Sequence, residues 1–268
     1  MAYTSTGGCR VRILVCVKQV PDIESPLSID EDSLWILEDD RIAFRMNRYD
    51  EFALEEAVLI RESLVDVTVD AITVGPSRAA SVLKKSLERG AVNAIHIVCE
   101  TPGYCPPALT ASLLADYARN NCYDLILTGV MAEDDMQCQV GPLLAARLGL
   151  PCAVSVVRES ISLAGRTITV ECEMEGGVAE TVILPLPCLL TIQSGINRPR
   201  YPSLSNVLRA KEQELLRIFP EGNAATFSIE KALSLSYPVK STHGTIIEGS
   251  TEEKAEKLLT LLHEKSLL

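Results

Sequence analysis

Short apolar runs alternate with helical patterns through the first half of the chain, and this alternation restricts the fold more than any other feature. Four runs of strand length are each followed by a helical pattern: 11–17, 69–75, 93–98 and 125–129. Asn47 can cap the first helix, and Gly90 closes the second. A βα series of this kind predicts an α/β fold, a doubly wound, mainly parallel, Rossmann-like sheet with helices on both faces and right-handed crossovers.

The second half of the chain changes texture. Residues 167–174 and 178–184 alternate apolar and polar side chains around Gly176-Gly177, which predicts an added antiparallel hairpin. A helix is predicted over 207–216. We divide the chain into an α/β domain over 1–235 and a C-terminal arm over 236–268. The arm ends in a helix with a Ser250–Glu253 capping box. Its apolar stripe consists of Ala255, Leu258, Leu259 and Leu262. This helix either packs on a partner subunit or folds back on its own domain.

The run from Asp124 to Pro142 combines an apolar strand, a polar loop and the start of a helix. The strand ends at Gly129, the loop carries three acidic residues at 133–135, and the helical pattern begins near Leu143. At the carboxyl end of a parallel strand, free backbone N–H groups and the helix dipole favour bound phosphate. A nucleotide site is therefore the first functional hypothesis, and its alternative is an ordinary βα junction, which has the same outline.

The composition argues against several classes of protein. The net charge of -11 and the pI of about 4.9 argue against nucleic acid as the main partner, because neutralising phosphates needs an excess of Lys and Arg. No apolar run approaches the roughly 20 residues of a membrane span. The first residues also lack the apolar core of a signal peptide. We therefore expect a cytoplasmic protein with no membrane span.

The cysteines and histidines form no recognisable chemical motif. The 9 cysteines include no C-x-x-C pair and are scattered through apolar strands, which indicates reduced core thiols rather than a metal site. None of the histidines has a catalytic neighbour in sequence: His96, His243 and His263. The G-x-S-x-G, G-x-G-x-x-G and P-loop patterns are missing. The residues alone therefore predict no catalytic centre and no metal site.

Six segments carry a family resemblance. They are KQVPD (18–22), NRYDEFALEEA (47–57), VGP (74–76), the loop 129–142, MEGGVAET (174–181) and INRPRYPSLSNVLRAK (196–211). In this order they resemble the beta (small) subunit of electron-transfer flavoproteins over nearly the whole chain. The resemblance implies a heterodimer in which an alpha subunit carries the redox-active FAD and this subunit binds an adenine nucleotide. It also implies an electron carrier rather than an enzyme with its own active site.

The same resemblance implies a nucleotide pocket at the strand ends and in the acidic loop. At Gly129 a missing Cβ would let the ligand approach the backbone, and Asn47 and Gln139 lie at helix starts where amides face phosphate. Asp134 and Asp135 would repel phosphate, so we expect them to hold ribose or adenine edges or to cap the helix. The predicted cofactor-binding residues are Cys16, Lys18, Asn47, Arg48, Tyr49, Asp50, Val74, Gly75, Gly129, Val130, Met131, Ala132, Glu133, Asp134, Asp135, Met136, Gln137, Cys138, Gln139, Val140 and Gly141.

The acidic loop bears on which nucleotide is bound. Family members with AMP tend to read A-I-D-D-D-x-N-Q-T-G, whereas electron-bifurcating members with a second FAD tend to read A-I-D-G-D-T-A-Q-V-G-P together with K-Q-V-P-D. Asp135 in place of the bifurcating glycine favours AMP, while Lys18 and the Q-V-G-P element favour a second FAD. A stand-alone adenine-nucleotide sensor is a more distant alternative that leaves the segment 196–211 unexplained.

The resemblance finally implies a docking segment. In the family, the segment matching 200–209 anchors the carrier on flavin-dependent dehydrogenases of the acyl-CoA type, and electrons then pass to an acceptor oxidoreductase. The central leucine of that segment matches Leu204, which stands among polar residues; the alternative is that Leu204 caps a helix starting near Ser205. The predicted docking residues are Arg200, Tyr201, Pro202, Leu204, Asn206 and Arg209.

Overall fold

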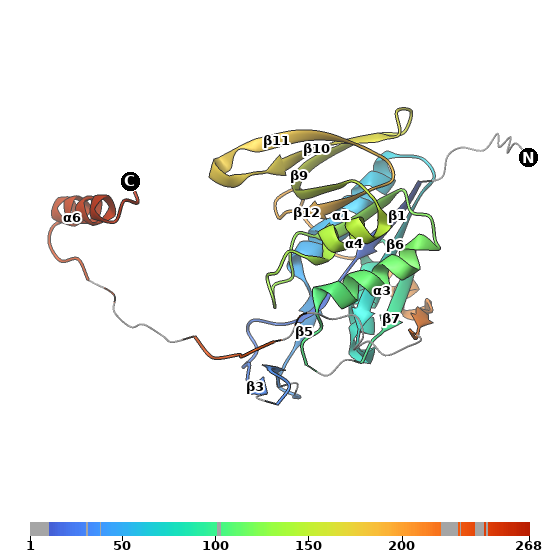
Figure 1. Ribbon diagram of the computed structural model, residues 1–268, viewed down its shortest axis with the longest axis horizontal. Helices are drawn as coiled ribbons and strands as arrows, with labels where there is room; N and C mark the ends of the chain where they lie inside the picture. Colours follow the sequence, from blue (N-terminus) through green and yellow to red (C-terminus); the bar gives the residue numbers. More distant parts are fainter. Residues whose placement is uncertain are drawn as a thin grey trace, which may run out of the picture. The chain divides into compact units, whose positions relative to one another are not determined.

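The computed structural model describes residues 11–268 except 31, 38, 101–102, 221–229, 231, 239–243 and 245. Its contacts divide the chain into two compact units, Met1–Leu235 and Ser236–Leu268. Among the described residues, the first unit contains a 9-stranded sheet in the order β11-β10-β9-β12-β8-β1-β6-β7-β13 (Figure 1). The bounds of these strands are β1 (Val11–Cys16), β6 (Val67–Gly75), β7 (Asn93–Val98), β8 (Leu125–Gly129), β9 (Cys152–Ser162), β10 (Thr167–Glu173), β11 (Ala179–Pro185), β12 (Cys188–Ile192) and β13 (Leu216–Ile218).

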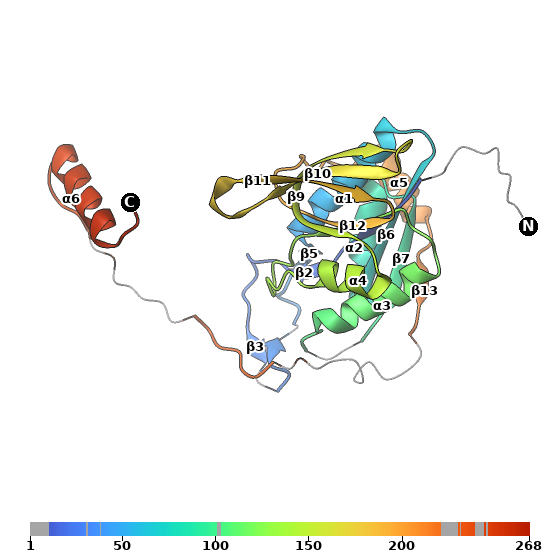
Figure 2. The same cartoon turned by 45° about the horizontal axis from the view of Figure 1, so that its top comes forward.

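The strand directions confirm the predicted mainly parallel α/β fold. Parallel pairing runs without interruption from β9 through β12, β8, β1, β6 and β7 to β13. At the other edge, β10 pairs antiparallel with both β9 and β11, so that the predicted hairpin extends the same sheet (Figure 2). Gly176 and Gly177 make its turn with φ of 77° and 75°, a left-handed conformation that glycine adopts without strain. The central strands are apolar on both sides because helices cover both faces.

Two helical layers bury the two faces of the sheet. α1 (Arg48–Ser63) and α2 (Ala80–Arg89), the latter preceded by the 3-10 turn η1 (Ser77–Ala79), pack on one face with the cluster that contains Leu54 and Leu83. α3 (Pro107–Arg119) and α4 (Val140–Leu148) pack on the other with the cluster that contains Leu114 and Leu144. Figure 1 shows α3 and α4 in front of the sheet and α1 behind it. The carboxyl ends of β1, β6 and β8 therefore meet between the two layers.

Two small antiparallel sheets lie in the polar insert that follows β1. β2 (Gln19–Pro21) pairs with β5 (Phe44–Met46), and β3 (Ile29–Asp30) pairs with β4 (Trp35–Ile36). The alternation of apolar residues did not predict them, because strands of two or three residues are too short to show a period. The short 3-10 turn η2 (Glu175–Gly177) belongs to the β10–β11 hairpin.

The helix predicted over 207–216 was placed too late in the chain. α5 runs over Leu204–Glu212, because the Ser203 side chain caps it by accepting a hydrogen bond from Asn206 N at 3.3 Å. Its carboxyl end is fixed by Lys84 Nζ, which donates to the carbonyl oxygen of Ala210 at 2.9 Å and also to that of Gln213. Leu216 belongs to the predicted helix but in the structure begins β13 at the sheet edge.

The second unit contains α6 (Thr251–Glu264), and its predicted capping box is present. Ser250 Oγ accepts from Glu253 N at 3.2 Å, and Glu253 Oε2 accepts from Ser250 N at 2.8 Å. No residue of α6 is buried, and Leu258 and Leu259 of the apolar stripe are each 50% exposed. Residues 239–243 and 245 of the predicted arm lie outside the described residues. No helix in the described part of the chain is long and apolar enough to cross a membrane.

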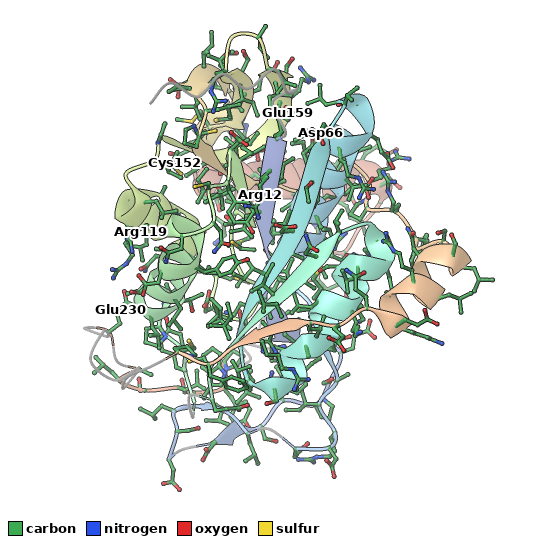
Figure 3. All side chains as sticks on the ribbon, turned by 90° about the vertical axis from the view of Figure 1, so that its right-hand side faces the viewer. Arg12, Asp66, Arg119, Cys152, Glu159 and Glu230 are labelled. Carbon is green, nitrogen blue, oxygen red and sulfur yellow. The ribbon has the colours of Figure 1, made fainter. Side chains whose placement is uncertain are left out.

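Two carboxyl groups meet between α1 and β9, the buried Glu56 and the half-buried Glu159. Glu56 on α1 is hydrogen-bonded to Glu159 on β9. Figure 3 labels Glu159 near the top of the view. Asn197 Nδ2 donates to Glu56 Oε2 at 2.7 Å. Burial, together with the Glu56 charge, raises the pKa of Glu159 from 4.5 to about 7, and burial also raises the pKa of Glu56. The pair is therefore most stable when one carboxyl group keeps its proton.

We predict that Glu159→Gln flattens the pH dependence of stability. Because the native state holds the Glu159 proton more tightly than the unfolded chain, the wild type loses stability as pH rises from about 4.5 to 7. The glutamine amide can donate to Glu56 without titrating, so the variant should gain stability relative to wild type at pH 8 but not at pH 4.5. Urea unfolding at the two pH values measures this, with the exposed substitution Glu180→Gln as control. An equal difference at both pH values would contradict the prediction.

Candidate functional site

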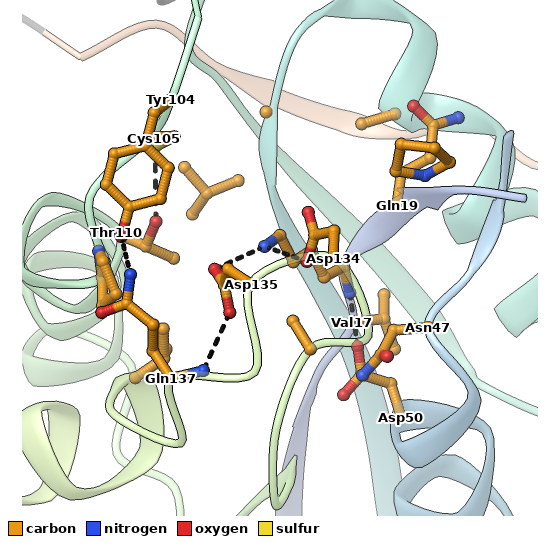
Figure 4. Close-up of a pocket in the computed structure, with 18 of the residues that line it drawn as sticks. Val17, Gln19, Asn47, Asp50, Tyr104, Cys105, Thr110, Asp134, Asp135 and Gln137 are labelled. Atoms are coloured by element: carbon orange, nitrogen blue, oxygen red, sulfur yellow. Dashed lines mark hydrogen bonds and ion pairs between the residues drawn. The ribbon is translucent and has the colours of Figure 1, made fainter. Parts of the chain in front are cut away.

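A cavity of about 480 Å³ lies at the carboxyl ends of β1, β6 and β8. Its lining comes from the residues that follow these strands, from the β3–β4 insert, from the loop after β7 and from the start of α4. Figure 4 shows part of this lining, with Asp134 and Asp135 of the acidic loop between Tyr104 and Asn47. This volume falls within the range of roughly 300–1,000 Å³ that is usual for small-molecule sites. It is also the position where open parallel sheets bind nucleotides.

Asp50 holds the floor of this cavity together. Its carboxylate accepts hydrogen bonds from Lys18 N at 2.7 Å and from Gly129 N at 3.0 Å, and its side chain is buried. Burial raises the pKa of Asp50 to about 7, although the two N–H donors oppose that rise. At Gly129 an added Cβ would lie 2.6 Å from Tyr49 Cβ and would also collide with Asp50. The missing Cβ therefore makes room for α1, while Gly129 itself lines the cavity.

Asn47 fastens the acidic loop to α1. It occupies the N-cap position, but its side chain makes no capping bond. Instead its Nδ2 donates to Met131 O at 2.8 Å, and its Oδ1 accepts from Glu133 N at 3.1 Å. Glu133 does not line the cavity and pairs with Arg45 at 2.9 Å. These contacts set the path of the loop between β8 and α4.

Lys18 pairs with both aspartates of the loop. Its Nζ lies 2.7 Å from Asp134 Oδ1 and 3.0 Å from Asp135 Oδ2. Burial alone would lower the pKa of Lys18, but the two carboxylates raise it overall. Burial raises the pKa of Asp134, and Asp135 adds to that rise, because one ammonium faces two acidic groups. The backbone N–H of Gln137 also donates to Asp135 Oδ1 at 3.2 Å, so Asp135 is held from two sides.

The start of α4 faces the cavity with backbone donors. Gln139, its N-cap, makes no side-chain cap, and the first turn contains no acidic residue. Gly141 brings the helix close to the sheet, since a Cβ there would lie 2.5 Å from Thr191 Cγ2 and 2.9 Å from Thr128 Oγ1. Val140 and Gly141 both line the cavity. Their N–H groups and the helix dipole make this the part of the cavity best suited to a phosphate.

The start of η1 and α2, by contrast, already has an anion. Glu100 Oε1 accepts from Ser77 N at 2.8 Å and from Ser77 Oγ at 2.7 Å, and these bonds lower the pKa of Glu100. Both Glu100 and Pro76 line the cavity. A bound phosphate is therefore disfavoured at this second helix start and favoured at α4.

Most of the predicted nucleotide-binding residues line this one cavity. Four do not: Arg48, Tyr49, Glu133 and Met136. The other predicted residues that line it are Cys16, Lys18, Asn47, Asp50, Val74, Gly75, Gly129, Val130, Met131, Ala132, Asp134, Asp135, Gln137, Cys138, Gln139, Val140 and Gly141. Sequence reasoning missed several lining residues from the insert and the strand ends, for which no local motif exists: Trp35, Phe44, Arg78, Glu100, Tyr104 and Thr110.

The cysteines supply no further chemistry that the geometry supports. Those in the described part of the chain are free thiols, and burial raises the pKa of Cys16 in the cavity wall. Within the same residues, no group of three or more Cys, His, Asp and Glu side chains is arranged to hold a metal ion. His96 is buried in β7, where its Nε2 lies 3.1 Å from Gly75 O. Cys9 and His243 lie outside the described residues.

Comparison with known proteins decides the family. The model of the electron transfer flavoprotein domain matches residues 34–218. The electron transfer flavoprotein subunit beta of Methylophilus methylotrophus is 30% identical over 262 residues, which cover 95% of this chain and 98% of that protein. The subunit beta of Bacillus subtilis (strain 168) is 31% identical over 265 residues, with 96% and 99% covered. The human subunit beta is 31% identical over 253 residues, with 92% and 96% covered.

The chain belongs to the electron transfer flavoprotein family, as a beta subunit. Its relatives are named as electron carriers rather than as catalytic enzymes, in agreement with the sequence-based prediction.

The predicted docking residues of this beta subunit divide into an anchored set and an exposed set. Arg200 pairs with Glu55 at 2.9 Å and with Glu62, both on α1. Arg209 Nη2 donates to Leu87 O at 3.2 Å, and Asn206 belongs to the cap of α5. Tyr201 and Leu204, in contrast, are 97% and 75% exposed, and Pro202 between them is partly buried. Leu204 is the first residue of α5, with Ser203 rather than Leu204 as its cap.

We predict that Lys18→Met destabilises the protein at neutral pH. The variant would leave Asp134 and Asp135, which are 7% and 11% exposed, without their cation. Breaking a fully buried pair costs roughly 3–5 kcal/mol, and because the Lys18 side chain is 38% exposed we expect about 2 kcal/mol. Chemical unfolding at pH 7.5 and pH 5 tests this, since protonation of Asp134 should reduce the loss at pH 5. The exposed substitution Lys85→Met is the control, and equal stability of the two variants at pH 7.5 would contradict the prediction.

Proposed function

We propose that this chain pairs with an electron transfer flavoprotein alpha subunit that carries the redox-active FAD, and that it binds AMP in its own cavity. The heterodimer would carry electrons from flavin-dependent dehydrogenases of the acyl-CoA type to an acceptor oxidoreductase. Family membership supports the carrier role, since the relatives are named electron transfer flavoprotein subunit beta. In this proposal the AMP is structural and stabilises the fold by mass action without accepting electrons.

The position of Asp135 is the observation that carries the preference for AMP. A dinucleotide must pass a second phosphate beyond the first, whereas AMP needs only one anion site, which the start of α4 can provide. Asp135 is held by Lys18 Nζ at 3.0 Å and by Gln137 N at 3.2 Å, and its side chain is 11% exposed. Moving it aside would break both contacts and leave a carboxylate unpaired. This arrangement favours a ligand that ends near α4.

A second FAD in this cavity is the alternative, and one observation favours it. The cavity extends past the strand ends to the β3–β4 insert, where Trp35, Ile36 and Leu37 line it. Such an apolar extension could accommodate an isoalloxazine ring. The subunit would then belong to an electron-bifurcating flavoprotein.

Nucleotide content distinguishes the two versions. The chain is co-expressed with its alpha subunit, the complex is purified under native conditions, and the nucleotides are released by acid and separated by chromatography. We expect one FAD and one AMP per heterodimer. Two FAD and no AMP would reject the AMP version and establish the alternative, whereas no nucleotide beyond the alpha-subunit FAD would reject both. Failure of the two chains to co-purify would contradict the heterodimer itself.

We also propose that the segment 200–209 docks on the dehydrogenase and that the arm 236–268 docks on the alpha subunit. The exposed side chains Tyr201 and Leu204 are presented by a segment that Arg200 anchors to α1. An exposed apolar side chain on a rigid support is typical of an interface anchor, because little conformational entropy is lost on binding. The exposed stripe of α6 has the composition expected of a helix that packs on a partner.

Leu204→Ala should weaken docking without weakening the fold. Leucine anchors in a partner pocket contribute about 2 kcal/mol, which corresponds to roughly a thirtyfold loss of affinity. The measurement is reduction of the heterodimer by its dehydrogenase across a concentration series, with thermal unfolding as the stability check. Leu216→Ala is the matched control, since Leu216 is 55% exposed but lies on β13. An unchanged concentration dependence with intact flavin content would show that this segment does not dock.

A further inference from the structure

Part of the cavity wall comes from segments outside the main sheet. The β3–β4 insert and the loop after β7 supply it, and they meet at two contacts. Gly103 has φ of +72°, and a Cβ there would lie 2.7 Å from the backbone oxygen of Ser33. Next to it, the rings of Trp35 and Tyr104 lie with their centroids 5.3 Å apart and their planes tilted by 51°. The two segments therefore hold one aromatic pair against the cavity.

This pair borders the cavity and does not fill the core. Trp35 and Tyr104 are both half-buried and line the cavity, and neither is part of the two hydrophobic clusters that bury the sheet. The chain has 1 tryptophan, 7 tyrosines and 4 phenylalanines, and Phe44 lines the same cavity. Trp35, the one tryptophan of the sequence, therefore lies in the cavity wall and does not contribute to the hydrophobic core.

Hydrogen bonds connect the aromatic pair to the start of α4. Gln137 Nε2 donates to the Tyr104 hydroxyl oxygen, and Figure 4 shows the two side chains pointing toward each other. Gln139 Nε2 in turn donates to Gln137 Oε1 at 2.8 Å, and Gln139 is the N-cap of α4. Tyr104 is thereby positioned relative to the backbone donors that are best placed for a phosphate. A ligand with its phosphate at α4 can therefore bring the rest of its structure to the rings.

We propose that Trp35 and Tyr104 form an aromatic clasp that stacks on a planar heteroaromatic ring of the bound nucleotide and so determines which ligands the cavity retains. The inference rests on the proposed nucleotide function and deepens it. Stacking on aromatic side chains suits any flat π-system, which includes both adenine and isoalloxazine. Ligands that offer the phosphate and the sugar without a ring should be bound much more weakly.

The single tryptophan gives a direct test. The full chain, freed of nucleotide, is titrated with AMP, FAD and ribose 5-phosphate while Trp35 emission is recorded, and affinities are measured by calorimetry. We expect AMP, FAD or both to change the emission and ribose 5-phosphate to leave it unchanged. Trp35→Ala and Tyr104→Ala should each weaken nucleotide binding by about 5- to 100-fold, the range that stacked bases show on alanine substitution. Trp35→Phe keeps a ring and should stay within about threefold of wild type.

Leu37→Ala is the matched control, because Leu37 lines the same cavity from the same insert but has no ring. Weaker AMP binding by Trp35→Ala identifies the stacked ring as adenine, whereas weaker binding of FAD alone identifies isoalloxazine; emission decides nothing for FAD, since a bound flavin quenches tryptophan emission whether or not it stacks. Nucleotide binding by Trp35→Ala and Tyr104→Ala no weaker than by Leu37→Ala, with Trp35 emission unchanged by AMP, would overturn the clasp and leave the proposed function standing. Absence of any nucleotide binding by the wild-type chain would overturn both.

Discussion

A buried carboxylate makes the cavity possible. Where parallel strands end, their last N–H groups lose the partners that the sheet ladder provides, and such donors are costly to bury unpaired. Asp50 satisfies two of them at once, on Lys18 and on Gly129, from the first turn of α1. The same contacts fix the helix over the strand ends and leave the space beyond them open. Placing this carboxylate out of water disfavours its charged form, and the pKa of Asp50 is therefore raised to about 7.

Lys18 and Asp135, whose identities favoured different cofactors in the sequence, form an ion pair in the structure. Lys18 matched the bifurcating pattern and Asp135 the AMP pattern, and the structure joins them by an ion pair at 3.0 Å. Each residue therefore changes what the other can do. The ammonium that would otherwise attract a phosphate is shared between Asp134 and Asp135, and its single positive charge offsets only part of the negative charge of the two carboxylates. The character of the site depends on the trio and not on any single position.

The sequence predicted features that are written in local patterns. The strand and helix periods located the parallel sheet and the β10–β11 hairpin, because the spacing of apolar residues in an element reflects which of its faces is buried. The spacing of Ser250 and Glu253 likewise located the capping box of α6. The residues of the acidic loop were found in the same way, as a polar run between a strand and a helix. Asn47 was also placed correctly at a helix start, yet its side chain holds a loop 84 residues away and does not cap the helix.

Features that depend on distant contacts were missed or misread. Nothing near Trp35 in the sequence indicates that it will meet Tyr104, since the contact exists only once the insert and the loop after β7 are folded. The sequence also did not reveal that the missing Cβ of Gly129 makes room for Tyr49 on α1. The carboxyl end of α5 likewise depends on Lys84 from α2, which no pattern within α5 reveals.

The anchoring of Arg200 determines which substitutions the docking segment can tolerate. The guanidinium of Arg200 pairs with both Glu55 and Glu62, two carboxylates on one side of α1. The backbone N–H of Arg200 also donates to Glu55 Oε2 at 3.0 Å. A planar fork with several fixed donors can serve two acceptors at once, whereas the ammonium of lysine is a single point charge on a flexible stem. Arginine and lysine are therefore not interchangeable here. The neighbouring Tyr201 and Leu204 carry no such internal constraint, so this stretch can vary its outward face while its attachment stays the same.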